Sequence, residues 1–277
     1  MAVVLDAGSG FVPLSYDLLR EGGIEEVVVL FTHYHHDHTQ GLFLSPLIFM
    51  KNMGLRLVGP LQNGVDPKQM LEDLMRPPYF PVHHREVDSH IVCKGLEFPK
   101  TWLGLFHPQG GGRLMEVDAY EKLLLKGRFL PIGKGQYPVS ECLVVTMRIA
   151  NHPEQTITYR FEERPTKKTF VLLTDHENQS GLPLDVQKHL QNADVIFMDA
   201  QYNDATYQKR TSGFGHGTPR YCVRVAKQVG AKRLGLTHHD PNAKDTDVDA
   251  ILAEARTEPG SEDLDVFLCA DYQEIDV

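Results

Sequence analysis

Histidine and aspartate gather in one short stretch of the sequence, residues 32–38, which reads Thr-His-Tyr-His-His-Asp-His. Imidazole and carboxylate groups suit zinc, manganese or iron, and three such ligands leave a position open for water. His33 and His35 can present two imidazoles on one side of an extended turn, while Asp37 and His38 project toward a second position once the chain coils. We therefore predict a loop that serves two metal ions about 4 Å apart, as in two-metal hydrolases. A merely solvated histidine-rich loop is disfavoured by this ordering directly after an apolar run.

One loop cannot complete two coordination spheres, so further ligands are expected at the ends of other strands. His152, Asp175 and His238 each follow an apolar run that is typical of a strand. His239 stands beside His238, and the sequence leaves open which of the two is the last ligand. Because all three lie at strand ends, a metal site is favoured over a chance distribution of these residues.

The elements that would position these residues alternate along the chain. Continuous β-branched runs indicate buried strands, and apolar residues at helical spacing indicate helices, with Asp66 as one N-cap. This interleaving favours a layered α/β sandwich. We expect strands at 3–5, 27–31, 55–58, 142–149, 156–161, 169–174, 195–198, 234–237 and 266–269, and helices at 14–21, 41–53, 67–75, 184–191, 219–229 and 247–256.

The segment 77–140 is less regular than the rest of the chain. Pro77-Pro78, Gly110-Gly111-Gly112 and Gly133-Lys134-Gly135 break it into loops and short strands. We interpret it as an insertion or lid over one end of the fold. Residues 1–277 are accordingly expected to form a single domain that carries this insertion.

The pattern T-H-x-H-x-D-H, followed by a later histidine, a later aspartate and a C-terminal histidine, resembles the metallo-β-lactamase superfamily. The resemblance covers nearly the whole chain except 77–140, and it implies an αββα sandwich with the metals at one edge. It implies one ion held by His33, His35 and His152, a second held by Asp37, His38 and His238, and Asp175 bridging both together with a hydroxide.

A second motif narrows the resemblance to one branch of that superfamily. Gly215-His216-Gly217-Thr218-Pro219, continuing to Leu236-Thr237-His238, is similar to the corresponding stretch of ribonuclease Z and related phosphodiesterases. The resemblance implies that a bridging hydroxide attacks phosphorus while His216 protonates the leaving oxygen or stabilises the charge that develops on it. His216 and Asp37 are the expected catalytic residues. The prediction is a phosphodiesterase for a small diester such as a cyclic nucleotide, with zinc as the expected metal and manganese or iron as alternatives.

Two other functions fit the same ligand set. A two-metal site could hydrolyse a lactone, a carboxylic ester or a thioester, because each needs only a polarised oxygen and a hydroxide. A non-hydrolytic di-metal sensor or redox protein would also use these ligands. The histidine of the Gly-His-Gly-Thr-Pro stretch favours the phosphodiesterase.

Several neighbouring polar residues have roles that the sequence leaves open. Asp199 ends an apolar run, where it either orients a ligand histidine or is a turn residue. His36, His239 and His176 stand next to expected ligands, and each could either orient a ligand or compete for the metal. Asp6 begins a glycine-rich turn, and a structural role is expected for it.

Composition limits the partners. The net charge of −9 and the scattered Lys and Arg argue against extended nucleic acid, and the basic arm with which ribonuclease Z grips transfer RNA has no counterpart here. A small anionic substrate is expected instead, since bound metals would be the largest local positive charges. No apolar stretch is long enough for a membrane span. Four widely spaced cysteines without CxxC spacing and no export signal predict a cytoplasmic protein with reduced thiols.

The beginning of the sequence departs from the superfamily pattern. Members begin with a β-hairpin and a glycine-rich loop before the segment matched by Asp6 to Gly10, and this sequence opens within a strand. The N-terminal hairpin is therefore expected to be missing from this sequence: either the start is truncated, or the edge strand is covered by the insertion or by a partner, for which a homodimer is one arrangement.

Overall fold

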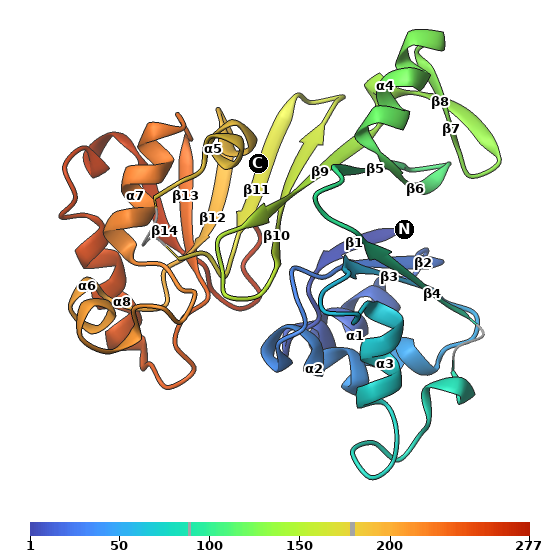
Figure 1. Cartoon of the computed structure of the whole chain (residues 1–277), viewed down its shortest axis with the longest axis horizontal. Helices are drawn as coiled ribbons and strands as arrows, with labels where there is room; N and C mark the ends of the chain where they lie inside the picture. The colour runs from blue at the N-terminus through green and yellow to red at the C-terminus, as the bar shows by residue number, and fades with distance from the viewer. Residues whose placement is uncertain (88–89, 178–180) are drawn as a thin grey trace. The chain divides into compact units, whose positions relative to one another are not determined.

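The computed structural model describes residues 1–87, 90–177 and 181–277, and these divide into two compact units (Figure 1). Unit 1 is Met1–Lys100 and unit 2 is Thr101–Val277. The division falls inside the segment 77–140, where the sequence predicts an insertion. Each unit has a sheet and an apolar core of its own, and the single domain with a lid stays a prediction.

Unit 1 is built on a four-stranded parallel sheet in the order β1-β2-β3-β4. The strand β2 lies inside the sheet and is almost entirely buried, as its β-branched run predicts. Its Val27 and Val29 pack in the apolar core with Phe11 of α1, Leu42 of α2 and Met70 of α3. The elements are β1 (Ala2–Leu5), α1 (Phe11–Glu21), β2 (Glu26–Leu30), α2 (His36–Leu44), the 3₁₀ turn Pro46–Phe49, β3 (Gly54–Pro60), α3 (Pro67–Leu74), the 3₁₀ turn His84–Glu86 and β4 (Ile91–Leu96).

Unit 2 is built on an eight-stranded mixed sheet in the order β14-β13-β12-β11-β10-β9-β5-β6. The strands β11 to β14 run parallel, and the strands from β11 across to β6 pair antiparallel. The strands are β5 (Trp102–His107), β6 (Gly111–Glu116), β9 (Leu143–Ala150), β10 (Thr156–Glu163), β11 (Lys168–Leu173), β12 (Val195–Asp199), β13 (Arg233–Thr237) and β14 (Asp265–Leu268), with a separate hairpin of β7 (Phe129–Ile132) and β8 (Gly135–Pro138).

Helix α7 (Pro219–Gln228) buries an apolar stripe against this sheet. In α7, Tyr221, Cys222 and Val225 join the core with Ile196 of β12 and Leu234 of β13. The helices are α4 (Val117–Lys126), α5 (Leu184–Leu190), α6 (Asp204–Thr206), α7 (Pro219–Gln228) and α8 (Asp245–Ala255), with a π turn at Tyr207–Thr211 and 3₁₀ turns at Val139–Glu141 and Ser261–Asp263. No helix in the described ranges has the length and apolarity to cross a membrane.

Most of the predicted strands and helices are present, and Asp66 is confirmed as an N-cap that accepts from the Gln69 amide at 2.9 Å. The helix predicted at 41–53 is wrong in its bounds. It begins at His36, inside the histidine cluster, and ends at Leu44, because Ser45 before Pro46 is extended. The segment 77–140 holds more regular structure than its glycines and prolines suggest, namely β4 to β8 and α4.

Candidate metal centre

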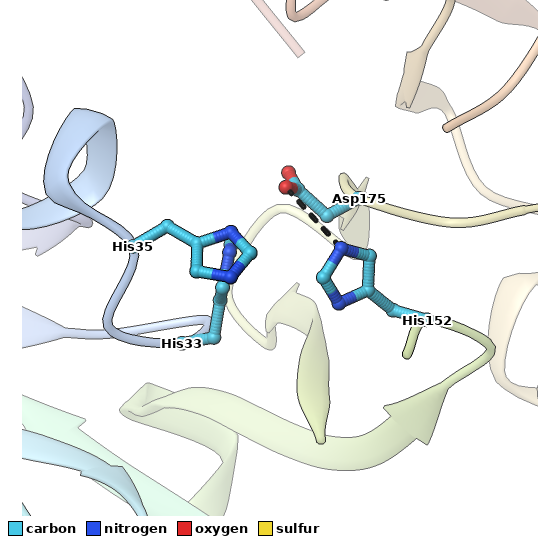
Figure 2. Close-up of side chains that lie close together, drawn as sticks. All are labelled: His33, His35, His152 and Asp175. Atoms are coloured by element: carbon cyan, nitrogen blue, oxygen red, sulfur yellow. Dashed lines mark ion pairs between the residues drawn. The ribbon is translucent and has the colours of Figure 1, made fainter. Parts of the chain in front are cut away.

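The histidine loop of unit 1 connects the end of β2 to the start of α2. His33 and His38 are buried, whereas His35 and Asp37 are exposed. The ring of His33 lies 4.3 Å from that of His35 and 4.2 Å from that of His38, measured between centroids. Figure 2 shows His33 and His35 leaving this loop side by side. The structure therefore places these potential donors close together on the short segment 33–38.

Asp6, directly after β1, holds this loop through hydrogen bonds. Its Oδ1 accepts from the Thr32 amide at 2.7 Å, and its Oδ2 accepts from the Thr32 hydroxyl at 2.9 Å. The same Oδ2 lies 2.8 Å from His38 Nδ1. A carboxylate on Nδ1 fixes the imidazole and directs Nε2 outward, which is how metal-binding histidines are commonly held. Nε2 of His38 lies 3.4 Å from Asp37 Oδ2, so two expected ligands of the second ion are neighbours.

Two glycines let the turn after β1 approach the first turn of α2. A Cβ on Gly8 would overlap the carbonyl oxygen of Asp37, and a Cβ on Gly41 would overlap that of Gly8. The Ala7 amide donates to the His38 carbonyl at 2.8 Å, and the Gly41 amide donates to the Ala7 carbonyl at 2.8 Å. The glycine-rich turn thus fixes the backbone that carries the expected ligands.

In unit 2, Asp175, His216 and His238 bring their donor atoms within 4.8 Å of one another. His238 Nε2 lies 3.3 Å from Asp175 Oδ1, and the rings of His216 and His238 stack with centroids 5.1 Å apart. Asp175 and His238 both have positive φ, 49° and 60°. Left-handed backbone at non-glycine residues is uncommon and concentrates at functional sites. The ends of β11 and β13 therefore converge on a polar cluster.

His152 joins this cluster from the end of β9. Its Nε2 lies 4.0 Å from Asp175 Oδ2, the ion pair that is dashed in Figure 2. Its Nδ1 lies 3.4 Å from Glu154 Oε2, and its side chain is 1% exposed. The structure thus brings together the expected ligands of unit 2 on the ends of three strands.

Asp199, at the end of β12, holds His216. Its buried Oδ2 lies 2.8 Å from His216 Nδ1, and its Oδ1 accepts from the Gln201 amide at 2.9 Å. The Gln201 side-chain amide in turn lies 3.1 Å from His238 Nδ1. Asp199 thus bonds both the histidine of the Gly-His-Gly-Thr-Pro stretch and the Gln201 amide of its own turn. That it orients a metal-ligand histidine stays a prediction.

Two other histidines beside expected ligands point elsewhere. His239 Nε2 donates to the Cys269 carbonyl at 3.3 Å, and burial lowers the pKa of this imidazole. His176 Nδ1 accepts from a backbone amide, and its Nε2 lies 2.8 Å from the Tyr221 hydroxyl. Burial lowers the pKa of His176 to about 4, so its ring is neutral near pH 7. Of the pair left open by the sequence, His238 is the one beside Asp175.

Glu177 is a residue of this region that the sequence analysis missed. It is 5% exposed and bonds to the loop that carries His216. A single glutamate in a loop after Asp175 and His176 carries no spacing signal, so only the fold reveals its contacts.

Comparison with known proteins places the chain among relatives of one kind. A family model described as "Beta-lactamase superfamily domain" matches residues 2–239. The chain is 26% identical over 271 residues to Ribonuclease Z of Myxococcus xanthus, covering 92% of this chain and 83% of the relative. It is 24% identical over 253 residues to Ribonuclease BN of Erwinia tasmaniensis, covering 86% and 78%. A 37% match to Ribonuclease Z of Thermoplasma acidophilum spans 24% of this chain and 21% of that protein.

Solved structures agree on the fold. Human tRNase Z, short form, is similar with a TM-score of 0.57 and 21% identity, covering 98% of this chain and 86% of that one. The metallo-beta-lactamase fold protein YhfI from Bacillus subtilis is similar with a TM-score of 0.56 and 19% identity, covering 97% and 84%. The predicted α/β fold class and the predicted resemblance to metallo-β-lactamase hydrolases are therefore confirmed.

Proposed function

Because this chain belongs to the beta-lactamase superfamily and is a hydrolase of that kind, we propose that it cleaves a small phosphodiester such as a cyclic nucleotide. The observation that carries this proposal is the histidine His216, whose Nδ1 is held 2.8 Å from Asp199 within the same cluster as Asp175 and His238. Cleavage of a diester with an alkoxide leaving group, such as a cyclic nucleotide, needs a proton at the leaving oxygen, and a histidine fixed at one nitrogen can supply it from the other.

The proposal includes two divalent metal ions. His33, His35 and His152 would hold one, Asp37, His38 and His238 would hold the other, and Asp175 would bridge them. When bound, the ions would lower the pKa of water and withdraw charge from the phosphoryl oxygens. Zinc suits this set of imidazoles and carboxylates, and manganese and iron are the alternatives.

The chain's own residues support that ligand set. The carboxylate of Asp6 on His38 Nδ1 leaves Nε2 of that ring as the ligand atom. Asp175 presents a carboxylate that is 1% exposed, and a buried carboxylate is costly unless cations or hydrogen bonds surround it. These features fit a divalent cation better than a solvated loop.

His216 would act as the general acid. Its Nδ1–H donates to Asp199, so the carboxylate fixes the tautomer and stabilises the imidazolium that precedes proton transfer. The proton on Nε2 would pass to the leaving oxygen as the phosphorus–oxygen bond breaks. Asp37, with an exposed side chain, completes the predicted catalytic pair as a ligand of the second ion.

A small anionic substrate is proposed rather than extended nucleic acid. The net charge of −9 leaves little electrostatic attraction for a phosphate backbone away from the metals. The four cysteines are free thiols, which suits the proposed cytoplasmic location. The homodimer stays a prediction.

The experiment is a hydrolysis panel with the purified full chain, freed of metal and then supplied with zinc or manganese separately. We expect cleavage of bis(p-nitrophenyl) phosphate and 3′,5′-cyclic AMP, and none in the metal-free protein. His216→Ala should lower the cyclic AMP rate by about 100-fold to 10,000-fold while metal content stays the same. Lactone or thioester hydrolysis without diester cleavage would overturn the proposal, and so would stoichiometric iron without any hydrolysis.

A further inference from the structure

Glu177 follows β11 and turns its carboxylate toward the loop before α7. Its Oε1 accepts from the Gly213 amide at 2.6 Å and from the Tyr207 hydroxyl at 2.7 Å. Its Oε2 accepts from the Gly215 amide at 3.0 Å. Three donors on one carboxylate that is 5% exposed make a strong, specific attachment, because charge-assisted hydrogen bonds gain strength away from water.

The loop that Glu177 holds has a geometry that only glycine allows. Gly213 and Gly215 have φ of 95° and 94°. A Cβ on Gly215 would overlap the imidazole of His152, so the backbone at this point rests directly against that ring. The residue after Gly215 is His216. A shift of this loop would therefore move the proposed general acid.

The backbone of Glu177 ties in the loop that carries His152. Its amide donates to the Asn151 carbonyl at 2.8 Å, and its carbonyl accepts from the Asn151 side-chain amide at 3.1 Å. Through its main chain Glu177 fixes the end of β9, and through its side chain it fixes the His216 loop. It also lies two residues after Asp175.

We propose that Glu177 is a positioning residue, which sets His216 relative to Asp175 by pinning the Gly213–Gly215 backbone. This inference rests on the proposed function of His216. Glu177 acts through the loop and not by proton transfer. Glu177→Gln keeps the size of the side chain but replaces one acceptor oxygen with a donor, which faces other donors and cannot bond to them.

The first test uses hydrogen exchange in the metal-free full chain, so it needs no activity. We expect the Gly213 and Gly215 amides of Glu177→Gln to exchange at least about tenfold faster than in the wild type, which corresponds to about 1.4 kcal/mol of lost protection. The matched control is Glu258→Gln, which removes a carboxylate that is 13% exposed and pairs with Arg224 in the same unit. Unchanged exchange at both glycines in Glu177→Gln would overturn the proposal, whatever the activity.

The second test compares leaving groups in the metal-loaded enzyme. p-Nitrophenolate leaves without a proton, whereas the alkoxide of 3′,5′-cyclic AMP needs one. We expect Glu177→Gln to lower kcat for cyclic AMP by about 100-fold and kcat for bis(p-nitrophenyl) phosphate by less than about tenfold, because a small misplacement of an acid weakens only the step that uses it. Glu258→Gln should leave both rates unchanged. A parallel loss on both substrates would contradict positioning of His216.

A double-mutant cycle separates action through His216 from an independent effect. In the His216→Ala background, Glu177→Gln should lower the cyclic AMP rate less than about twofold further, since the acid it positions is already gone. A multiplicative loss would show that Glu177 acts elsewhere and would overturn the inference while leaving the proposed function intact. If the wild-type protein cleaves no diester, the proposed function is rejected. Hydrogen exchange at the Gly213 and Gly215 amides would still test whether Glu177 holds this loop.

Discussion

The two units supply potential metal donors in different ways. In unit 1, the donors lie within residues 33–38, on one connection between a strand and a helix. In unit 2, His152, Asp175, His216 and His238 come from four separate segments at the ends of β9, β11 and β13 and before α7. Local donors depend on the conformation of one loop, whereas the donors of unit 2 depend on the packing of a whole sheet.

The supporting residues follow the same division. Asp6 comes from the neighbouring strand β1 and bonds Thr32 and His38, which both belong to the histidine loop. In unit 2, Asp199 and Glu177 reach the His216 loop from other strand ends. We infer that unit 1 is specialised for holding metal, while unit 2 also places the group that moves a proton.

The largest expected effects come from substitutions of histidines in pairs that lie close in the sequence. In unit 1, His33→Ala should lower the rate of hydrolysis on the order of a thousandfold or more and should lower the metal content. His36→Ala, at the exposed start of α2, should change neither the rate nor the metal content. In unit 2, His238→Ala should match His33→Ala, and His239→Ala should keep most of the activity because its ring bonds the Cys269 carbonyl. Elemental analysis and diester hydrolysis measure both, and loss of metal in His239→Ala alone would reverse the assignment.

A smaller effect should distinguish the two supporting aspartates. Asp6→Asn should weaken metal affinity by about 10-fold to 100-fold, because His38 loses the carboxylate that orients its ring. Asp199→Asn should leave metal affinity close to the wild type and lower the cyclic AMP rate by about 100-fold, since its carboxylate lies on His216. Metal titration measures the metal affinity of each variant, and kcat for cyclic AMP is measured on the metal-saturated enzymes. Equal losses of affinity in both would erase the proposed difference between the units.

The same contrast explains which parts of the site could be predicted from the sequence. The loop 33–38 was predictable because its donor types are adjacent, and the strand-end donors were predictable because each follows a long apolar run. Glu177 was not, since its partners Gly213 and Gly215 are more than thirty residues away in the chain and meet it only in the folded sheet. The role of Asp6 on His38 depends likewise on the pairing of β1 with β2.

The fold shows a similar limit. The strands with continuous apolar runs, such as β2 and β12, were predicted nearly to the residue. The strands β5 and β6 were not, because glycines interrupt their apolar pattern and the pairing of β5 with β9 is long-range. The start of α2 was predicted too late in the chain, because the polar residues His36 to His38 do not show the apolar spacing from which helices were predicted.

A stability effect of intermediate size should test the close backbone approach in unit 1. Gly8→Ala should lower the free energy of unfolding by about 1–3 kcal/mol, because the new Cβ would overlap the Asp37 carbonyl oxygen and the backbone must move. Gly10→Ala is the matched control, since no atom lies within 4 Å of its Cβ position. Urea denaturation of metal-free protein measures both. Equal stability of the two variants would show that the turn does not fix the histidine loop.

The smallest expected effect lies in unit 2 and depends on pH. His189 of α5 is 5% exposed, and burial, with Arg148 and Arg160 nearby, lowers its pKa to about 3. Below about pH 6.5 the unfolded chain binds a proton at this histidine and the folded chain does not, so stability is full above that pH and falls as the pH drops toward 3. The slope from one such group is at most about 1.4 kcal/mol per pH unit.

His189→Gln should remove this contribution, so that urea midpoints at pH 6.5 and pH 5 differ less than in the wild type. A smaller slope remains, because burial also lowers the pKa of His176, to about 4. His36→Gln, which changes an exposed imidazole in unit 1, should leave the difference between the two midpoints as it is. If the two substitutions change the pH dependence of the urea midpoint equally, the acid sensitivity does not come from the buried imidazole of His189. The packing of α5 against its sheet would then tolerate a protonated histidine at this position.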